Sequence, residues 1–155
     1  FSLIFFLLLM FIGGCAGSTA CGIKIFRLQM LLMFLKNQVK RIISPNSVII
    51  TKYNNQKISD DFINSVIVFI FSFLFIFLII ALLLSVSGLD FITSISGAAS
   101  AISNVGPGLG DVIGPNGNYK DIPDTSKWIL SAGMLLGRLE LFAVLVLFFP
   151  SFWRN

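Results

Sequence analysis

One long uncharged run, FINSVIVFIFSFLFIFLIIALLLSVS from Phe62 to Ser87, limits what this chain can fold into. A helix needs about 20 apolar residues to cross a hydrocarbon core about 30 Å thick, so this run is long enough to cross with some tilt. The composition agrees, because 56% of the 155 residues are hydrophobic and 12% are charged. An ordinary soluble domain is about 45–50% apolar and about 25% charged. We therefore predict an all-α membrane protein.

A second candidate span runs from Trp128 to Pro150, and tryptophans flank it as interfacial aromatic residues flank membrane helices. The first apolar segment, Phe1 to Ile12, is too short to cross a membrane alone. It also lacks an initiator methionine and the basic start of a secretory signal. We expect it to be the tail of a longer element, and the chain to be a C-terminal fragment.

The distribution of charge orients these spans. Lysine and arginine outnumber acidic residues in the linker 44–61 and the helix end before it, and short loops of that kind stay on the cytoplasmic side. The loop 111–127 holds more aspartates than lysines, which suits the outer side. We therefore predict that helix 62–87 runs outward and that helix 128–150 runs inward. Segment 23–43 has helical periodicity and is a further inward helix.

Two glycine-rich stretches interrupt the apolar sequence: GGCAGSTACGIK at 13–24 and NVGPGLG at 104–110. A short helix is predicted before each, at 1–12 and at 91–103, the latter with Asp90 as its N-cap. Irregular backbone at membrane depth survives only where it is buried in protein or lines a watery cavity. Glycine brings carbonyl oxygens close to a ligand, and aligned carbonyls replace the water shell of a cation. The C-terminal ends of both helices carry partial negative charge and would also favour a cation.

The glycine-rich stretches are also open to a nucleotide-binding or a packing role. Gly17 and Gly22 have the five-residue offset of a nucleotide-binding loop, but the lysine after them is displaced by one position and no Ser or Thr follows it. Small residues can also pack helices together. Packing would explain Gly133 and Gly137, spaced by four, but not NVGPGLG, which cannot remain helical.

Cys15 and Cys21 lie within the first glycine-rich stretch, and the chain contains no histidine. A metal site made of two cysteines alone would be incomplete, and nothing in the sequence signals a disulfide across so short a loop. We interpret both cysteines as small residues packed where two backbone segments cross.

Arg138 lies about ten residues into the last span, which is a depth of about 15 Å at a rise of about 1.5 Å per residue. A charge near the midplane costs about 2.5–3.5 kcal/mol to insert, so it should face a cavity or a partner. Two roles for Arg138 remain open. Carboxylates or carbonyls elsewhere in the bundle could hold it in place. Alternatively, its guanidinium could lie on the ion path, below the carbonyls that bind the cation, and act as an electrostatic gate.

Three motifs in this order, GGCAGSTACGIK, SNVGPGLGDV and GRLELFAVLVLFFPSFWR, resemble the last third of the Trk-type potassium uptake subunits, the TrkH family of the Trk/Ktr/HKT superfamily. The resemblance covers the whole chain and implies a potassium channel-like fold of four helix–pore loop–helix repeats. Residues 1–43 would be the pore loop and second helix of repeat three, 44–61 a cytoplasmic linker and 62–155 the complete repeat four. Repeat four would comprise an outward helix 62–87, a pore helix and filter 90–110, an extracellular loop 111–127 and an inward helix 128–150.

The resemblance also implies site residues. Gly17 and Gly106 would be the central glycines of the third and fourth filter strands. Arg138 matches an arginine of the family that is implicated in gating. In the family that arginine acts against an interrupted helix, which corresponds here to the helix from Ile23 onward. Members usually have Gly-Gly where this chain has Cys21-Gly22, and we expect altered helix entry rather than lost selectivity. The residues expected to bind potassium through backbone carbonyls are Cys15, Ala16, Gly17, Ser18, Thr19, Asn104, Val105, Gly106, Pro107 and Gly108.

The family implies transmembrane potassium uptake in the bacterial inner membrane by a multi-pass protein that is not an enzyme and needs no cofactor, with potassium as the transported substrate. The implied partners are membrane lipid, a second copy in a homodimer and cytosolic nucleotide-binding TrkA subunits; no nucleic acid is expected. The basic segment 36–57 either contacts TrkA or only sets the topology. Because two pore strands cannot close a fourfold ring, the alternative is a non-conducting membrane scaffold or a relic fragment of a transporter.

Overall fold

The computed structural model describes residues 1–44, 52–53 and 56–138. The helices in these residues are α1 (Ser2–Phe11), α2 (Ile25–Ile43), α3 (Asp60–Val86), α4 (Phe91–Ser103) and α5 (Asp124–Arg138). Two-residue strands, β1 (Lys52–Tyr53) and β2 (Gln56–Lys57), pair antiparallel within the predicted linker. The predicted all-α architecture is confirmed, and this small hairpin is the addition to it.

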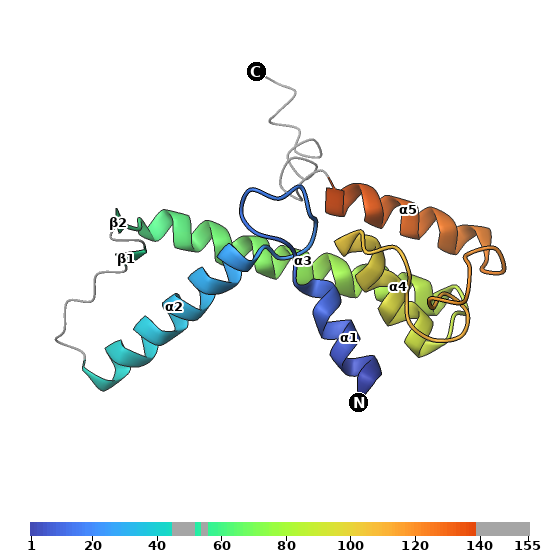
Figure 1. Cartoon of the computed structure of the whole chain (residues 1–155), viewed down its shortest axis with the longest axis horizontal. Coiled ribbons are helices and arrows are strands. Elements are labelled where there is room, and N and C mark those ends of the chain that lie inside the picture. The colour runs from blue at the N-terminus through green and yellow to red at the C-terminus, as the bar shows by residue number, and fades with distance from the viewer. Residues whose placement is uncertain (45–51, 54–55, 139–155) are drawn as a thin grey trace, which may run out of the picture.

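Helix α3 is the long axis of the molecule (Figure 1). Its N-terminus is capped by Ser59, whose hydroxyl accepts a hydrogen bond from the backbone N–H of Phe62 at 3.4 Å. Among the described helices, α3 alone is long and apolar enough to cross a membrane, over Asp61–Val86. The uncharged run therefore forms one helix with the length and composition that a membrane span requires.

Helix α4 packs against α3 on one side and α5 on the other (Figure 1). The carboxylate of Asp90 accepts a hydrogen bond from the N–H of Thr93 at 3.3 Å, which confirms the predicted N-cap. The small residues of α4 are buried and let its neighbours approach closely. Its alanines join a core formed by Ile80, Ala81, Leu84, Ala98, Ala101, Ile113, Ile122 and Leu130.

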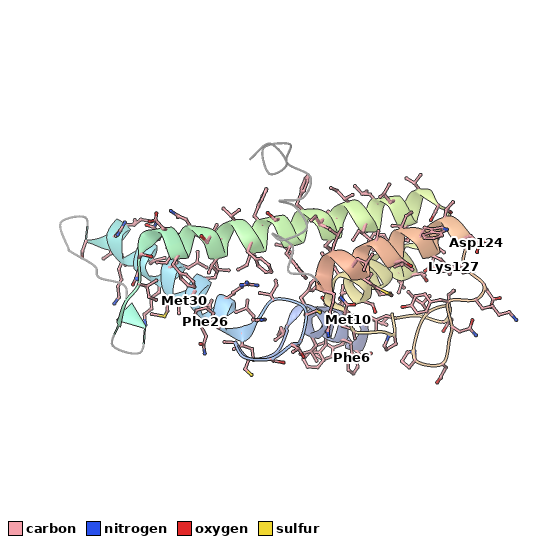
Figure 2. The ribbon with its side chains drawn as sticks, turned by 90° about the horizontal axis from the view of Figure 1, so that it is seen from above. Phe6, Met10, Phe26, Met30, Asp124 and Lys127 are labelled. Atoms are coloured by element: carbon pink, nitrogen blue, oxygen red, sulfur yellow. The ribbon has the colours of Figure 1, made fainter. Side chains whose placement is uncertain are left out.

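Helix α2 packs on the N-terminal half of α3. The rings of Phe26 and Phe62 lie 5.8 Å apart, and Met30 on the same helix is 1% exposed; both α2 residues are labelled in Figure 2. A second core cluster, Ile23, Phe69, Phe73 and Ile102, joins the start of α2 to α3 and to the end of α4. This cluster brings the two glycine-rich stretches to the same region of the fold.

Helix α5 begins at Asp124, four positions before the predicted start at Trp128. The prediction followed the apolar sequence, whereas the helix extends into the polar loop and is supported there by an ion pair between Lys127 Nζ and Asp124 Oδ1 at 2.9 Å (Figure 2). The rest of the predicted inward helix, 139–150, lies outside the described residues. Glycines on α5 do pack helices together: a Cβ at Gly137 would lie 1.9 Å from the carbonyl oxygen of Ile102.

Candidate functional site

The first glycine-rich stretch folds into a closed loop between α1 and α2, visible in Figure 1. Its ends are joined where the N–H of Gly13 donates to Ile23 O and the N–H of Ile23 donates to Phe11 O, both at 2.9 Å. Glycine is required at position 13, because a Cβ there would lie 2.5 Å from Cys21 O. The chain therefore leaves helical form at 13–24 and returns to it at α2.

The second glycine-rich stretch is tied back onto α4 by two serines of that helix. The Ser96 hydroxyl accepts from Leu109 N at 3.0 Å, and its single proton is shared between Ile92 O at 2.7 Å and Leu109 O at 3.2 Å. One turn later, the Ser100 hydroxyl accepts from Gly106 N at 3.2 Å and donates to Gly106 O at 2.9 Å. These bonds fix the main chain of Gly106 and Leu109 within an irregular segment.

The start of this segment requires an unusual backbone. Asn104, the C-cap of α4, has φ 52 and Gly106 has φ 112, which are left-handed conformations that asparagine and glycine tolerate best. The Gly106 oxygen also accepts a hydrogen bond of 2.6 Å from Tyr119 Oη. By contrast, the carbonyls of Asn104, Val105, Pro107 and Gly108 accept no hydrogen bond from the part of the chain that the structure describes.

Arg138, the last described residue of α5, reaches the first stretch. Its Nη1 donates to the carbonyl oxygen of Thr19 at 3.2 Å and lies 3.8 Å from Cys21 Sγ. The same end of α5 is fixed to the second stretch, because Asn104 Nδ2 donates to Met134 O at 3.0 Å. The end of α5 thus joins both glycine-rich stretches.

A cavity of about 610 Å³ lies between the two stretches. The two stretches therefore share one open space, with Arg138 and Phe6 also in its wall. The first stretch contributes Gly13, Gly14, Ala20 and Cys21 to it, and the second contributes Asn104, Val105, Pro107, Gly108 and Leu109. A smaller cavity of about 360 Å³ is lined by Ser18, Thr19, Lys24, Arg27, Phe69 and Arg138, among others.

The smaller cavity is rich in cations. Lys24, Arg27 and Arg138 all line it, and the Arg27 guanidinium carbon lies 3.7 Å from the centroid of the Phe69 ring. A guanidinium over an aromatic face gains a cation–π attraction.

Outside the cavity, hydrogen bonding to the Thr93 side chain lowers the pKa of the Asp90 carboxyl below its ordinary value, with a further contribution from the Thr93 N–H.

The structure separates the predicted residues of the first strand. Cys15, Ala16 and Gly17 lie in an exposed turn closed by a hydrogen bond from Ser18 N to Cys15 O at 3.0 Å, away from the larger cavity. Ser18 and Thr19 line the smaller cavity with Arg138. In the second strand, Gly106 has its oxygen occupied by Ser100 and Tyr119, while its neighbours line the larger cavity.

The first stretch is not a nucleotide-binding loop. Such a loop follows a strand, whereas helix α1 precedes this stretch, so that alternative is wrong. Cys15 and Cys21 are free thiols. No carboxylate or histidine joins them in a group of three or more potential metal ligands among the described residues.

Sequence reasoning missed Ser96, Ser100 and Tyr119. The two serines are spaced by four on a helix of small residues, which places them on one face. That spacing was a usable signal for a face that holds polar backbone. Nothing in the sequence around Tyr119 signals its partner, because the bond depends on how the loop after Gly110 folds back.

Comparison with known proteins gives a consistent result. The family model TrkH, described as cation transport protein, matches residues 1–155. The chain is 50% identical over 150 residues to the Trk system potassium uptake protein TrkI of Halomonas elongata, covering 97% of this chain and 30% of that protein. It is 37% identical over 145 residues to Trk system potassium uptake protein TrkH of Escherichia coli K12, covering 94% of this chain and 29% of that protein.

The fold is similar to a solved structure, the potassium transporter TrkH from Vibrio parahaemolyticus. The TM-score is 0.88 at 33% sequence identity, and the match covers 98% of this chain and 32% of that one. The chain thus spans about a third of the length of the proteins it matches.

Proposed function

This chain belongs to the TrkH cation transport protein family, and from that premise we propose that it contributes two of four selectivity-filter strands and a gating arginine to transmembrane potassium uptake. Its relatives are transporters and not enzymes. Potassium is the transported ion, and no cofactor is indicated. As a family member the chain is a membrane protein, and we propose that it is a multi-pass protein of the bacterial inner membrane.

One observation carries the proposal: two non-helical backbone segments line a single cavity of about 610 Å³. In the second segment, the carbonyls of Asn104, Val105, Pro107 and Gly108 accept no hydrogen bond from the described residues. Carbonyl oxygens without donors can replace the hydration shell of potassium. An unbonded carbonyl at membrane depth is tolerated only beside water, protein or an ion.

The repeat organisation completes this proposal. Residues 1–43 act as the pore loop and second helix of repeat three, 44–61 as a cytoplasmic linker and 62–155 as repeat four. Helix α3 runs outward, and α4 re-enters as the pore helix. The segment 111–127, whose last residues form the first turn of α5, lies outside. The C-terminal end of α4, with its negative dipole end, adjoins the segment 104–110, which favours a cation there.

The carbonyl oxygens of the two glycine-rich stretches are not equally available to an ion. The Gly106 oxygen is occupied by two donors, and residues 15–17 lie in an exposed turn. We therefore assign coordination in the fourth strand to Asn104, Val105, Pro107 and Gly108. In the third strand, Cys15, Ala16, Gly17, Ser18 and Thr19 remain the proposed filter positions. Two of their oxygens also have donors in this structure, because Cys15 O accepts from Ser18 N and Thr19 O accepts from Arg138 Nη1, and potassium would have to displace these donors.

Arg138 is the proposed gate. Its guanidinium reaches Thr19 O at 3.2 Å, and this oxygen belongs to the proposed third filter strand. A cation that approaches Thr19 meets the fixed positive charge of Arg138, and like charges at short range repel. Uptake then requires Arg138 to move or to be neutralised by a partner.

The proposal extends to the partners of the family. They are membrane lipid, a second copy in a homodimer and a cytosolic TrkA ring that contacts the basic segment 36–57. The chain would supply only part of a fourfold pore, so the rest of the ring comes from further repeats.

The experiment uses a chimaera, named here the TrkI chimaera, in which this chain replaces the aligned 150 residues of Halomonas elongata TrkI. It is expressed in a bacterial strain without potassium uptake systems. Growth at low potassium and saturable Rb⁺ uptake are expected. A chimaera that reaches the membrane in a folded state and takes up no Rb⁺ removes the transport proposal and supports the non-conducting scaffold.

A further inference from the structure

The carbonyl oxygen of Gly106 is held from two directions. Ser100 Oγ donates to it at 2.9 Å from α4, and Tyr119 Oη donates at 2.6 Å from the loop that follows the filter segment. The Ser100 hydroxyl also accepts from Gly106 N at 3.2 Å. Two donors fill both lone pairs of one carbonyl oxygen, so this oxygen is directed into protein.

The peptide between Gly106 and Pro107 has no other polar group to orient it. Proline carries no backbone N–H, so the Gly106 oxygen is the only hydrogen-bonding atom of that peptide. Gly106 has φ 112, a conformation from which glycine rotates without a Cβ penalty. Ser100 and Tyr119 therefore decide which way the peptide faces.

The surrounding structure orients the Tyr119 hydroxyl toward the Gly106 oxygen. Its ring packs against the core cluster that contains Ile113 and Leu130. The loop that carries it is folded by hydrogen bonds from Gly108 N to Ile113 O at 2.7 Å and from Asn118 N to Val112 O at 3.1 Å. A tyrosine has few rotatable bonds, so little entropy is lost when the hydroxyl binds Gly106.

We propose that Tyr119 and Ser100 are positioning residues for ion selectivity: they hold the Gly106 oxygen away from the ion path, which fixes the number and spacing of the filter carbonyls. This inference rests on the proposed function. Discrimination between K⁺ and Na⁺ depends on the number and arrangement of coordinating carbonyls. Without the two hydroxyls, the 106–107 peptide rotates and adds an oxygen to the path.

The test compares radiotracer Na⁺ and Rb⁺ influx in the TrkI chimaera and its variants. Tyr119→Phe removes one hydroxyl and keeps the ring in the core, and we expect the ratio of Na⁺ to Rb⁺ influx to rise about threefold. Tyr119→Phe with Ser100→Ala removes both donors, and we expect a rise of about tenfold, which is the scale of net hydrogen-bond effects. The ratio is read per molecule at equal membrane abundance.

A matched control is Ser131→Ala, which removes a hydroxyl that donates to Lys127 O within α5 at 2.8 Å and is exposed. Its influx ratio stays unchanged. A purely structural role for Tyr119 would lower both fluxes together, and this result overturns the inference, as does an unchanged ratio in both variants. Loss of all Rb⁺ uptake in the unmutated chimaera instead removes the proposed function on which the inference rests.

Discussion

Arg138 and Thr19 are 119 residues apart in the sequence and are joined by a hydrogen bond of 3.2 Å from Arg138 Nη1 to the Thr19 carbonyl oxygen. The contact links the end of α5 to the loop that precedes α2. It satisfies one condition set by the sequence, because a deep arginine should face a cavity or a partner. Here it faces both a carbonyl and two cavities.

Replacing Arg138 with alanine removes both the charge and the donor at Thr19. We expect basal Rb⁺ uptake by the TrkI chimaera to rise about tenfold, since a hydrogen bond to a charged group contributes about 1.5–3 kcal/mol and about 1.4 kcal/mol is a factor of ten. Arg138→Lys keeps the charge and should give an intermediate rate. Unchanged or lower uptake at normal membrane abundance excludes the gating role.

Asn104 combines a left-handed backbone with a side-chain bond to Met134 O. Asn104→Gly loses the bond but also removes the Cβ at φ 52, whereas Asn104→Ala loses the bond and keeps a Cβ there. We expect the glycine variant to be destabilised by about 1 kcal/mol and the alanine variant by about 1–2 kcal/mol more. Thermal midpoints of the purified chimaera measure this order, and a reversed order contradicts the role of the backbone.

The sequence was sufficient for elements that have a strong local signal. The uncharged run defines α3, and Asp90 with the small residues after it defines α4 at its observed bounds, Phe91–Ser103. The departures from helix near Gly17 and Gly106 follow from glycine and proline chemistry. Each of these signals lies within a few residues of the feature it predicts.

The rest depends on contacts between distant segments. Hydropathy predicted that the last helix starts at Trp128, where the apolar sequence begins. Helix α5 starts earlier, at Asp124, because a helix can continue into polar sequence beyond its apolar part. The direction of the Gly106 oxygen is decided by Tyr119, and the partner of Arg138 by the loop closed between Gly13 and Ile23. No periodicity in the sequence encodes these pairings, so only the folded chain reveals them.

The Asp90 cap should make stability depend on pH in one direction. Its pKa is lowered in the folded chain, chiefly by hydrogen bonding with the Thr93 side chain, so its contribution is present above the ordinary carboxyl value, about 3.9. It is lost as the pH falls through the folded pKa. We expect this acid loss to be absent in Asp90→Asn, since asparagine also caps helices, while Asp90→Ala costs about 1 kcal/mol at neutral pH.

Thermal midpoints of the chimaera between neutral pH and pH about 3 test this expectation. The effect is small, because Asp90 is exposed and solvent weakens its interactions. Identical acid sensitivity in the unmutated and Asp90→Asn proteins contradicts the expected role of the carboxylate.

Gly137 and Gly133 lie one turn apart on α5 and differ in what an added methyl group meets. At Gly137 the Cβ would lie 1.9 Å from the Ile102 carbonyl oxygen, which is backbone, whereas at Gly133 the nearest atom is the flexible end of Ile80 at 3.0 Å. Overpacking typically lowers the free energy of unfolding by about 1–3 kcal/mol. We expect Gly133→Ala to fall within this range and Gly137→Ala to exceed it. Melting of the purified chimaera measures both, with Gly17→Ala as the control because its Cβ meets nothing within 4 Å. Equal midpoints for Gly137→Ala and Gly17→Ala would show that α5 does not sit against the end of α4.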